Sequence, residues 1–198
     1  VFLPTESPDL TLSGYTDQHN AKFVVYKVPY KSVFETKGPE GLVRSLTTNR
    51  NNTDPAKTAG LQTEYAETKD LVRKDIEGHF VEQVQLNPLG EGLYLVRAEV
   101  GKEVKFTWLT VTTLALVTKS EAGRVLAFVT DLQTGKPVPG ASLSVVKEKS
   151  LSPVGLTGPD GTFQFPIQVK ESDTQVVVAD LGSSRAFTWF YQSSASRS

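Results

Sequence analysis

Short runs in which apolar and polar residues alternate are the feature that most constrains the fold of this chain. A period of two places the apolar side chains on one face of a β-strand, and Gly- or Pro-containing breaks separate the runs. The pattern therefore predicts an all-β chain in which consecutive strands pair as antiparallel neighbours. The expected strands are Leu10–Leu12, Phe23–Val28, Phe80–Leu86, Leu93–Val100, Val104–Val111, Leu114–Val117, Val125–Thr130, Ala141–Val146, Gly161–Phe165, Gln175–Ala179 and Ala186–Tyr191.

The length of 198 residues exceeds the roughly 100 residues of one β-sandwich and suffices for two. A second set of strands begins after Val111, and no Pro- or Gly-rich linker precedes it. We therefore expect two tandem antiparallel β-sandwich domains of the immunoglobulin or fibronectin-III-like class. The predicted boundaries are residues 1–111 and 112–192, followed by a tail at 193–198.

The apolar pattern weakens between Pro29 and Val72. Residues 30–46 fit a short helical turn or an irregular edge, and residues 47–64 are almost wholly polar, which predicts a long exposed loop. We interpret this loop as an insertion rather than a functional element. Residues 70–77 carry five charges and indicate a solvated edge strand or hairpin.

Composition excludes several classes of function. A formal net charge of -1 gives no electrostatic basis for binding nucleic acid, and no apolar run approaches the 18 residues of a membrane span. The absence of Cys excludes disulfides, thiolate metal sites and cysteine nucleophiles. The start, Val1-Phe-Leu-Pro4, lacks the basic region and long apolar core of a signal peptide, so we expect that a signal was removed or that the sequence begins inside a longer chain.

The residue types that carry catalysis or bind metals do not form a recognisable motif. His19 and His79 are 60 residues apart and are expected to be surface histidines, because a metal site needs more ligands. No Gly-x-Ser-x-Gly elbow is present to activate a serine. We predict no catalytic, cofactor-binding or metal-binding residues and no cofactor, and we do not expect the chain to be an enzyme by itself.

The most specific stretch is Asp131–Val145, followed by Gly155–Phe165. Thr134-Gly135 predicts a turn, Lys136–Pro139 an extended segment, and Gly140 a bend before the next strand. Pro159-Asp-Gly161 predicts a tight turn that leads into another strand. This order of connector, strand, DG turn and strand resembles macroglobulin-type and carboxypeptidase-regulatory-type β-sandwich modules.

Nearly the whole second half resembles one macroglobulin module of bacterial alpha-2-macroglobulin-like proteins. Leu114–Lys119, Gly123–Leu132 and Val176–Phe187 carry the resemblance. The first half is similar to the preceding module through Pro8–Tyr15, Phe23–Val28 and Gly92–Ala98.

The resemblance implies two modules from the N-terminal region of a large protease inhibitor that traps proteases after cleavage of a bait segment. The implied partners are neighbouring macroglobulin modules of the same chain, and proteases through the full-length protein. The implied location is periplasmic, extracellular or anchored to the cell envelope. The family's thioester requires a Cys and cannot form here, so these residues are expected to be structural scaffold.

Aromatic residues lie near the end of each predicted module. Large aromatics dominate sandwich cores, and the run Phe187–Tyr191 is aromatic on both faces of a strand. We therefore expect core and inter-module packing. The candidate packing residues are Trp108, Phe187, Trp189 and Tyr191.

Two alternatives remain open. The chain could form stalk or adhesion modules of a bacterial surface protein, stapled by an isopeptide bond between Lys119 and Asp131 or Asp180. A carbohydrate-binding or transporter-associated sandwich would instead require an exposed aromatic platform.

Overall fold

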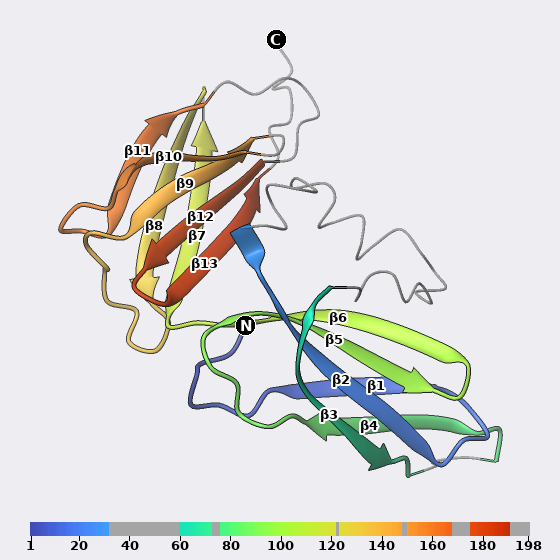
Figure 1. Ribbon diagram of the computed structural model, residues 1–198. Helices are drawn as coiled ribbons and strands as arrows, with labels where there is room; N and C mark the ends of the chain where they lie inside the picture. Colours follow the sequence, from blue (N-terminus) through green and yellow to red (C-terminus); the bar gives the residue numbers. More distant parts are fainter. Residues whose placement is uncertain (32–59, 73–75, 122, 148–149, 168–174, 191–198) are drawn as a thin grey trace. The chain divides into compact units, whose positions relative to one another are not determined.

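The computed structural model describes residues 1–31, 60–72, 76–121, 123–147, 150–167 and 175–190. Within these ranges the named elements are thirteen strands, and all of their mutual pairings are antiparallel, as the alternating pattern predicts (Figure 1). The strands are β1 (Asp9–Tyr15), β2 (Asn20–Val28), β3 (Gln62–Asp70), β4 (His79–Gln85), β5 (Gly92–Val100), β6 (Glu103–Val111), β7 (Leu114–Glu121), β8 (Arg124–Asp131), β9 (Ser142–Lys147), β10 (Ser150–Leu156), β11 (Thr162–Pro166), β12 (Gln175–Leu181) and β13 (Ser184–Phe190).

The described residues form two compact units, each with two sheets. Unit 1 contains residues 1–29 and 60–111, and unit 2 contains residues 112–190 together with Tyr30 and Lys31. In unit 1 the sheets have the strand orders β3-β2-β5-β6 and β1-β4. In unit 2 the orders are β10-β9-β12-β13 and β11-β8-β7.

The core of unit 1 lies between its two sheets. Phe23 and Val96 from the four-stranded sheet pack in one cluster with Phe80 and Val84 from β4. Fully burying a side chain of this size contributes about 1.5–3 kcal/mol, so the cluster favours the association of the two sheets. Tyr94 is completely buried in this core, and its hydroxyl donates a hydrogen bond of 2.8 Å to the carbonyl of Gly90, which satisfies the polar group.

The core of unit 2 is built in the same way from the inner faces of both sheets. Val125, Ala127 and Val129 on β8 alternate inward and pack with Leu143 on β9 and Val177 on β12. The period of two observed in the sequence therefore identifies the buried positions of β8, and β-branched residues suit these pleated surfaces.

The turns predicted around residues 131–165 are present. Gly135 and Gly140 have φ angles of 69° and 74°, and the amide of Gly135 donates a hydrogen bond of 2.9 Å to the carbonyl of Asp131. Pro137 forms a bridge with Thr130, which extends the connector along β8. The DG turn closes through a hydrogen bond of 2.9 Å from the amide of Gly161 to the carbonyl of Gly158.

The structure corrects the sequence-based expectation for residues 47–77 where it describes them. Residues 62–64 belong to β3 instead of the predicted loop, and the edge strand of this region is Gln62–Asp70. Of the edge strand or hairpin expected at residues 70–77, Asp70 ends β3, and residues 73–75 lie outside the described residues. An edge strand with half-buried Glu67 and Lys69 carries too little apolar signal to be recognised by its period. The interpretations of residues 32–46 and 47–59 lie outside the described residues.

A second unpredicted strand is β10, which contains Pro153 and Gly155 and shows a shift of register between them. Pro cannot donate to a ladder and Gly weakens a strand, so both residues are typical of an edge position with a bulge. The expectation that consecutive strands pair is confirmed for pairs such as β5–β6, β7–β8 and β12–β13, but it does not hold for every strand. β1 pairs with β4, and β11 pairs with β8, because the chain crosses between the two sheets of each unit.

Candidate functional site

The central strands of both four-stranded sheets are buried on two faces, not one. In unit 1 the face of β2 and β5 that points away from the core contains Val24, Val28, Leu93 and Leu95, all of them buried. We call this surface, together with Trp108 opposite Leu95 on β6, the outer face of unit 1. A strand that is buried on both faces has a nearly continuous apolar sequence, such as Phe23–Val25, and does not alternate between apolar and polar residues.

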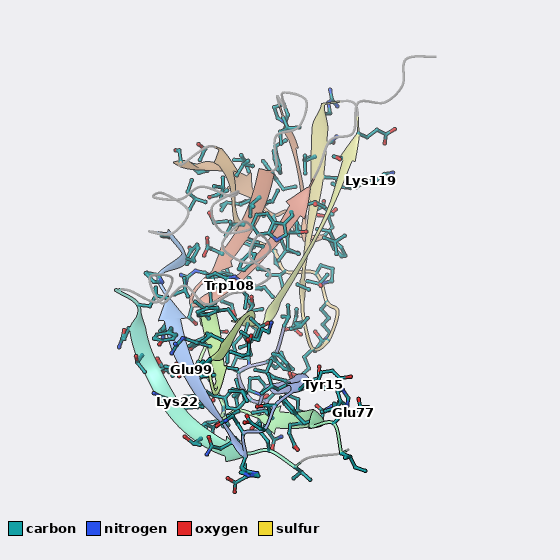
Figure 2. The ribbon with its side chains drawn as sticks, turned by 90° about the vertical axis from the view of Figure 1, so that its right-hand side faces the viewer. Tyr15, Lys22, Glu77, Glu99, Trp108 and Lys119 are labelled. Atoms are coloured by element: carbon teal, nitrogen blue, oxygen red, sulfur yellow. The ribbon has the colours of Figure 1, made fainter. Side chains whose placement is uncertain are left out.

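Two nitrogen donors on the outer face of unit 1 are buried without a hydrogen-bond partner. They are Nε1 of the half-buried Trp108, labelled in Figure 2, and Nε of Arg97. The guanidinium of Arg97 also forms an ion pair with Glu99, which lies opposite Lys22 on β2 (Figure 2). A buried polar group that makes no hydrogen bond costs about 1–3 kcal/mol, so such groups are uncommon in folded proteins and mark a surface with unused donors.

The corresponding surface of unit 2 is the outer face of β9, β12 and β13. Val146, Val176 and Val178 point away from the core of unit 2 and are nevertheless completely buried. Phe187 and Trp189 lie opposite Val178 and Val176 and are half-buried. Strand β12 is therefore covered on both sides.

A polar cluster closes one end of the outer face of unit 2. The hydroxyl of Tyr30 donates a hydrogen bond of 2.9 Å to Oδ1 of Asp180, which also accepts one of 2.8 Å from Nε of Arg185. The guanidinium carbon of Arg185 lies 4.2 Å from the centre of the Tyr30 ring, within the range of a cation–π contact. Asp180 and Arg185 are direct cross-strand partners near the turn between β12 and β13.

The cluster changes the acidity of the tyrosine. Burial of Tyr30, which is only 6% exposed, and the hydrogen bond to Asp180 together raise the pKa of its hydroxyl to about 12, and burial makes the larger contribution. Both effects favour the neutral phenol, because burial and a neighbouring carboxylate oppose the charged form. Tyr30 therefore remains a hydrogen-bond donor at neutral pH.

The candidate packing residues from the sequence fall on these outer faces. Trp108 lies on that of unit 1, while Phe187 and Trp189 come together on that of unit 2. Tyr191 lies outside the described residues. The role of these residues in packing between modules stays a prediction. The sequence did not indicate the contact of Tyr30 with Asp180, because no local pattern links residues that are 150 positions apart.

The remaining chemical candidates have structural surroundings. His19 is exposed. The ring of the half-buried His79 has its centre 4.9 Å from the centre of the Tyr15 ring, and Tyr15 is exposed. The part of the chain that the structure describes contains no group of three or more His, Cys, Asp or Glu side chains placed to hold a metal ion. Within the same ranges, no helix combines the length and apolar character needed to cross a membrane.

The geometry does not support the isopeptide bond proposed for a stalk module. Lys119 on β7 is exposed, and its Nζ lies 3.8 Å from Oε2 of Glu121 (Figure 2). Lys119 lies opposite Leu126, whereas Asp131 lies opposite Leu114, five positions away along β7. The carboxylate of Asp131 instead accepts hydrogen bonds of 2.7 Å from the amide and the hydroxyl of Thr134, which lower its pKa.

Comparison with known proteins identifies the fold. No family model and no curated protein matches this sequence. Among solved structures, the chain is similar to native alpha-2-macroglobulin from Escherichia coli in a crystal structure spanning domains MG0-NIE-MG1, with a TM-score of 0.72 and 15% identity over 94% of this chain and 60% of the other. A crystal structure spanning domains NIE-MG1 gives a TM-score of 0.66 and 17% identity over 90% of this chain and 86% of the other.

The same fold occurs within a much longer chain. A cryo-EM reconstruction of the native conformation of Escherichia coli alpha-2-macroglobulin matches 93% of this chain with a TM-score of 0.53 and 14% identity, but only 12% of its own length is covered. The resemblance noted in the sequence is thus confirmed at the level of fold, across both units. The chain spans about 60% of the three-domain fragment and a small part of the whole protein.

Proposed function

We propose that this chain is a pair of scaffold modules of a large alpha-2-macroglobulin-like protease inhibitor and does not perform chemistry itself. The observation that supports this most strongly is the extent of the fold likeness, which covers 90% of the chain and 86% of a fragment that contains two domains in series. On this basis unit 1 corresponds to the NIE domain and unit 2 to MG1. Fold alone does not imply function, so the proposal also relies on the nature of the surfaces.

The outer faces of the two units suit a scaffold role. Their half-buried aromatics, Trp108 on one and Phe187 and Trp189 on the other, lie beside fully buried aliphatic residues. Aromatic side chains of this kind supply much of the contact energy at protein interfaces. In the full-length protein these faces would pack within the array of modules, and the bait segment would lie elsewhere in the chain.

The proposed function is tested on the full-length parent protein. Antibody raised against this chain is used to blot the envelope fraction and the medium of the source cells before and after brief treatment with a broad-specificity protease. We expect a parent band many times larger than 21.6 kDa, cut at one preferred place, and protease activity towards a small peptide substrate in the immunoprecipitate.

The matched control is the same protease inactivated at its active site. It cannot cleave the bait and is expected to be absent from the immunoprecipitate. A parent not much larger than this chain, or one that is degraded without retaining the active protease, would contradict the proposal. It would then favour stalk or adhesion modules, although the register of β7 and β8 keeps Lys119 away from Asp131.

A further inference from the structure

The chain enters unit 2 at two places, and the same hairpin holds both. The first is Tyr30, which follows the end of β2 at Val28 after a single intervening residue, Pro29. The second is Thr113, two residues after the end of β6. The β12–β13 hairpin contributes the partners at both points.

The second entry point is fixed by a serine in the hairpin. The amide of Thr113 donates a hydrogen bond of 3.0 Å to Oγ of Ser184, and the two hydroxyl oxygens are 2.5 Å apart. The carbonyl of Thr113 accepts a further hydrogen bond of 2.7 Å from the amide of Leu132. Thr112 and Ser184 are buried polar residues, so these hydrogen bonds are shielded from water.

The first entry point is fixed by Asp180 and Arg185 of the same hairpin. Ser184 and Arg185 are adjacent, so the attachments of Tyr30 and Thr113 lie one residue apart on β13. The buried ring of Tyr30 contacts the guanidinium of Arg185, and its hydroxyl donates a hydrogen bond to Asp180. The ring of Pro29 fixes its own φ within a narrow range, which reduces the number of backbone conformations available between Val28 and Tyr30.

We infer that Tyr30 is a strap that fixes the segment after Pro29 onto the β12–β13 hairpin within unit 2. The stability of this hairpin then depends on a residue that lies two positions from the central strand of the other unit. Within unit 2, one hydrogen bond to Asp180 and one cation–π contact with Arg185 hold Tyr30 against the hairpin. Release of the ring would remove the hydrogen bond from Tyr30 to Asp180 and the cation–π contact with Arg185.

The inference is tested by hydrogen exchange of the whole chain, read by mass spectrometry from peptides that cover residues 175–190 and, separately, residues 92–100. Tyr30→Phe removes only the hydroxyl and is expected to speed exchange in residues 175–190 about fivefold, the factor of one ordinary hydrogen bond. Tyr30→Ala also removes the ring and is expected to give a roughly tenfold or greater increase. Exchange in residues 92–100 is expected to stay unchanged.

Tyr15→Phe and Tyr15→Ala are the matched controls, because Tyr15 is 69% exposed and packs on His79 in unit 1. They are expected to leave residues 175–190 unaffected. Unchanged exchange there in Tyr30→Ala, or an increase confined to residues 92–100, would overturn the inference. If Tyr30→Ala does not fold, the double variant Tyr30→Phe with Asp180→Ala decides, because alanine removes the acceptor of the Tyr30 hydroxyl. The strap requires a combined effect smaller than the sum of the single effects, and strictly additive effects would refute it.

Discussion

Thr157 provides the sharpest test of how the connector after β8 is held in unit 2. Its side chain is buried, and Oγ1 both accepts a hydrogen bond of 2.9 Å from the amide of Ala141 and donates one of 2.7 Å to the carbonyl of Val138. The backbone of Thr157 pairs with the same segment, through its amide to Ala141 and through its carbonyl from Gly140. One hydroxyl therefore ties together the two ends of the bend at Gly140.

Thr157→Val keeps the shape of the side chain but removes the hydroxyl. The amide of Ala141, a residue with no exposed surface, loses its partner, and so does the carbonyl of Val138. An unsatisfied buried donor costs about 1–3 kcal/mol and a carbonyl somewhat less, so we expect a loss of roughly 2–4 kcal/mol in the free energy of unfolding of unit 2. Thr157→Ser retains both hydrogen bonds and loses one methyl group, for which we expect about 1 kcal/mol.

The assay is thermal unfolding followed by tryptophan fluorescence in a Trp108→Phe background, in which Trp189 reports on unit 2 alone. For a domain of this size 1 kcal/mol corresponds to about 4–8 °C, so Thr157→Val should lower the Tm by roughly 10–25 °C and Thr157→Ser by roughly 5 °C. Thr118→Val, on β7 of unit 2 and outside its core cluster, is the control and should have little effect. A Thr157→Val protein no less stable than Thr157→Ser would refute the reasoning, since the polar contacts would then contribute nothing beyond shape.

Three further predictions concern pH, packing and covalent chemistry. Stability should fall as pH rises between 10 and 12, because Tyr30 and Tyr65 have a pKa of about 12 in the folded state whereas an ordinary tyrosine has a pKa near 10. Urea unfolding at pH 8 and pH 11 measures this loss of stability. Tyr30→Phe should reduce the difference in unfolding free energy between the two pH values. Gly155→Ala should destabilise unit 2 by about 2 kcal/mol or more, because the new Cβ would collide with the Phe163 ring. At Gly182 nothing lies within 4 Å of a new Cβ but φ is 63°, so Gly182→Ala should cost only about 1 kcal/mol. A thermal melt in which Gly182→Ala is the less stable variant would contradict this expectation. The intact mass should equal that of the sequence with no water lost, since Lys119 lies far along β7 from Asp131; a deficit of one water would revive the isopeptide-stapled stalk.

The amino-acid sequence by itself determined the fold class and most of the strands. Alternation in Val125–Thr130 and the rigid residues of Lys136–Pro139 act over a few positions, so each specifies its local structure without reference to the rest of the chain. The same locality made the DG turn at Pro159–Gly161 predictable, together with the glycine that its positive φ requires. Strands at sheet edges escaped recognition because β3 and β10 bury too little apolar surface to show a period.

Only the tertiary structure decided which strands pair across the two sheets and which faces are buried twice. The pairing of β1 with β4 and the contact of Tyr30 with Asp180 join residues that are far apart in the sequence. No local propensity encodes such a contact, because it depends on where the whole chain returns after folding and on how much apolar surface each return buries. The sequence predicted a packing role for the aromatics Trp108 and Trp189, and that role stays a prediction. Their places on the outer faces follow from topology alone.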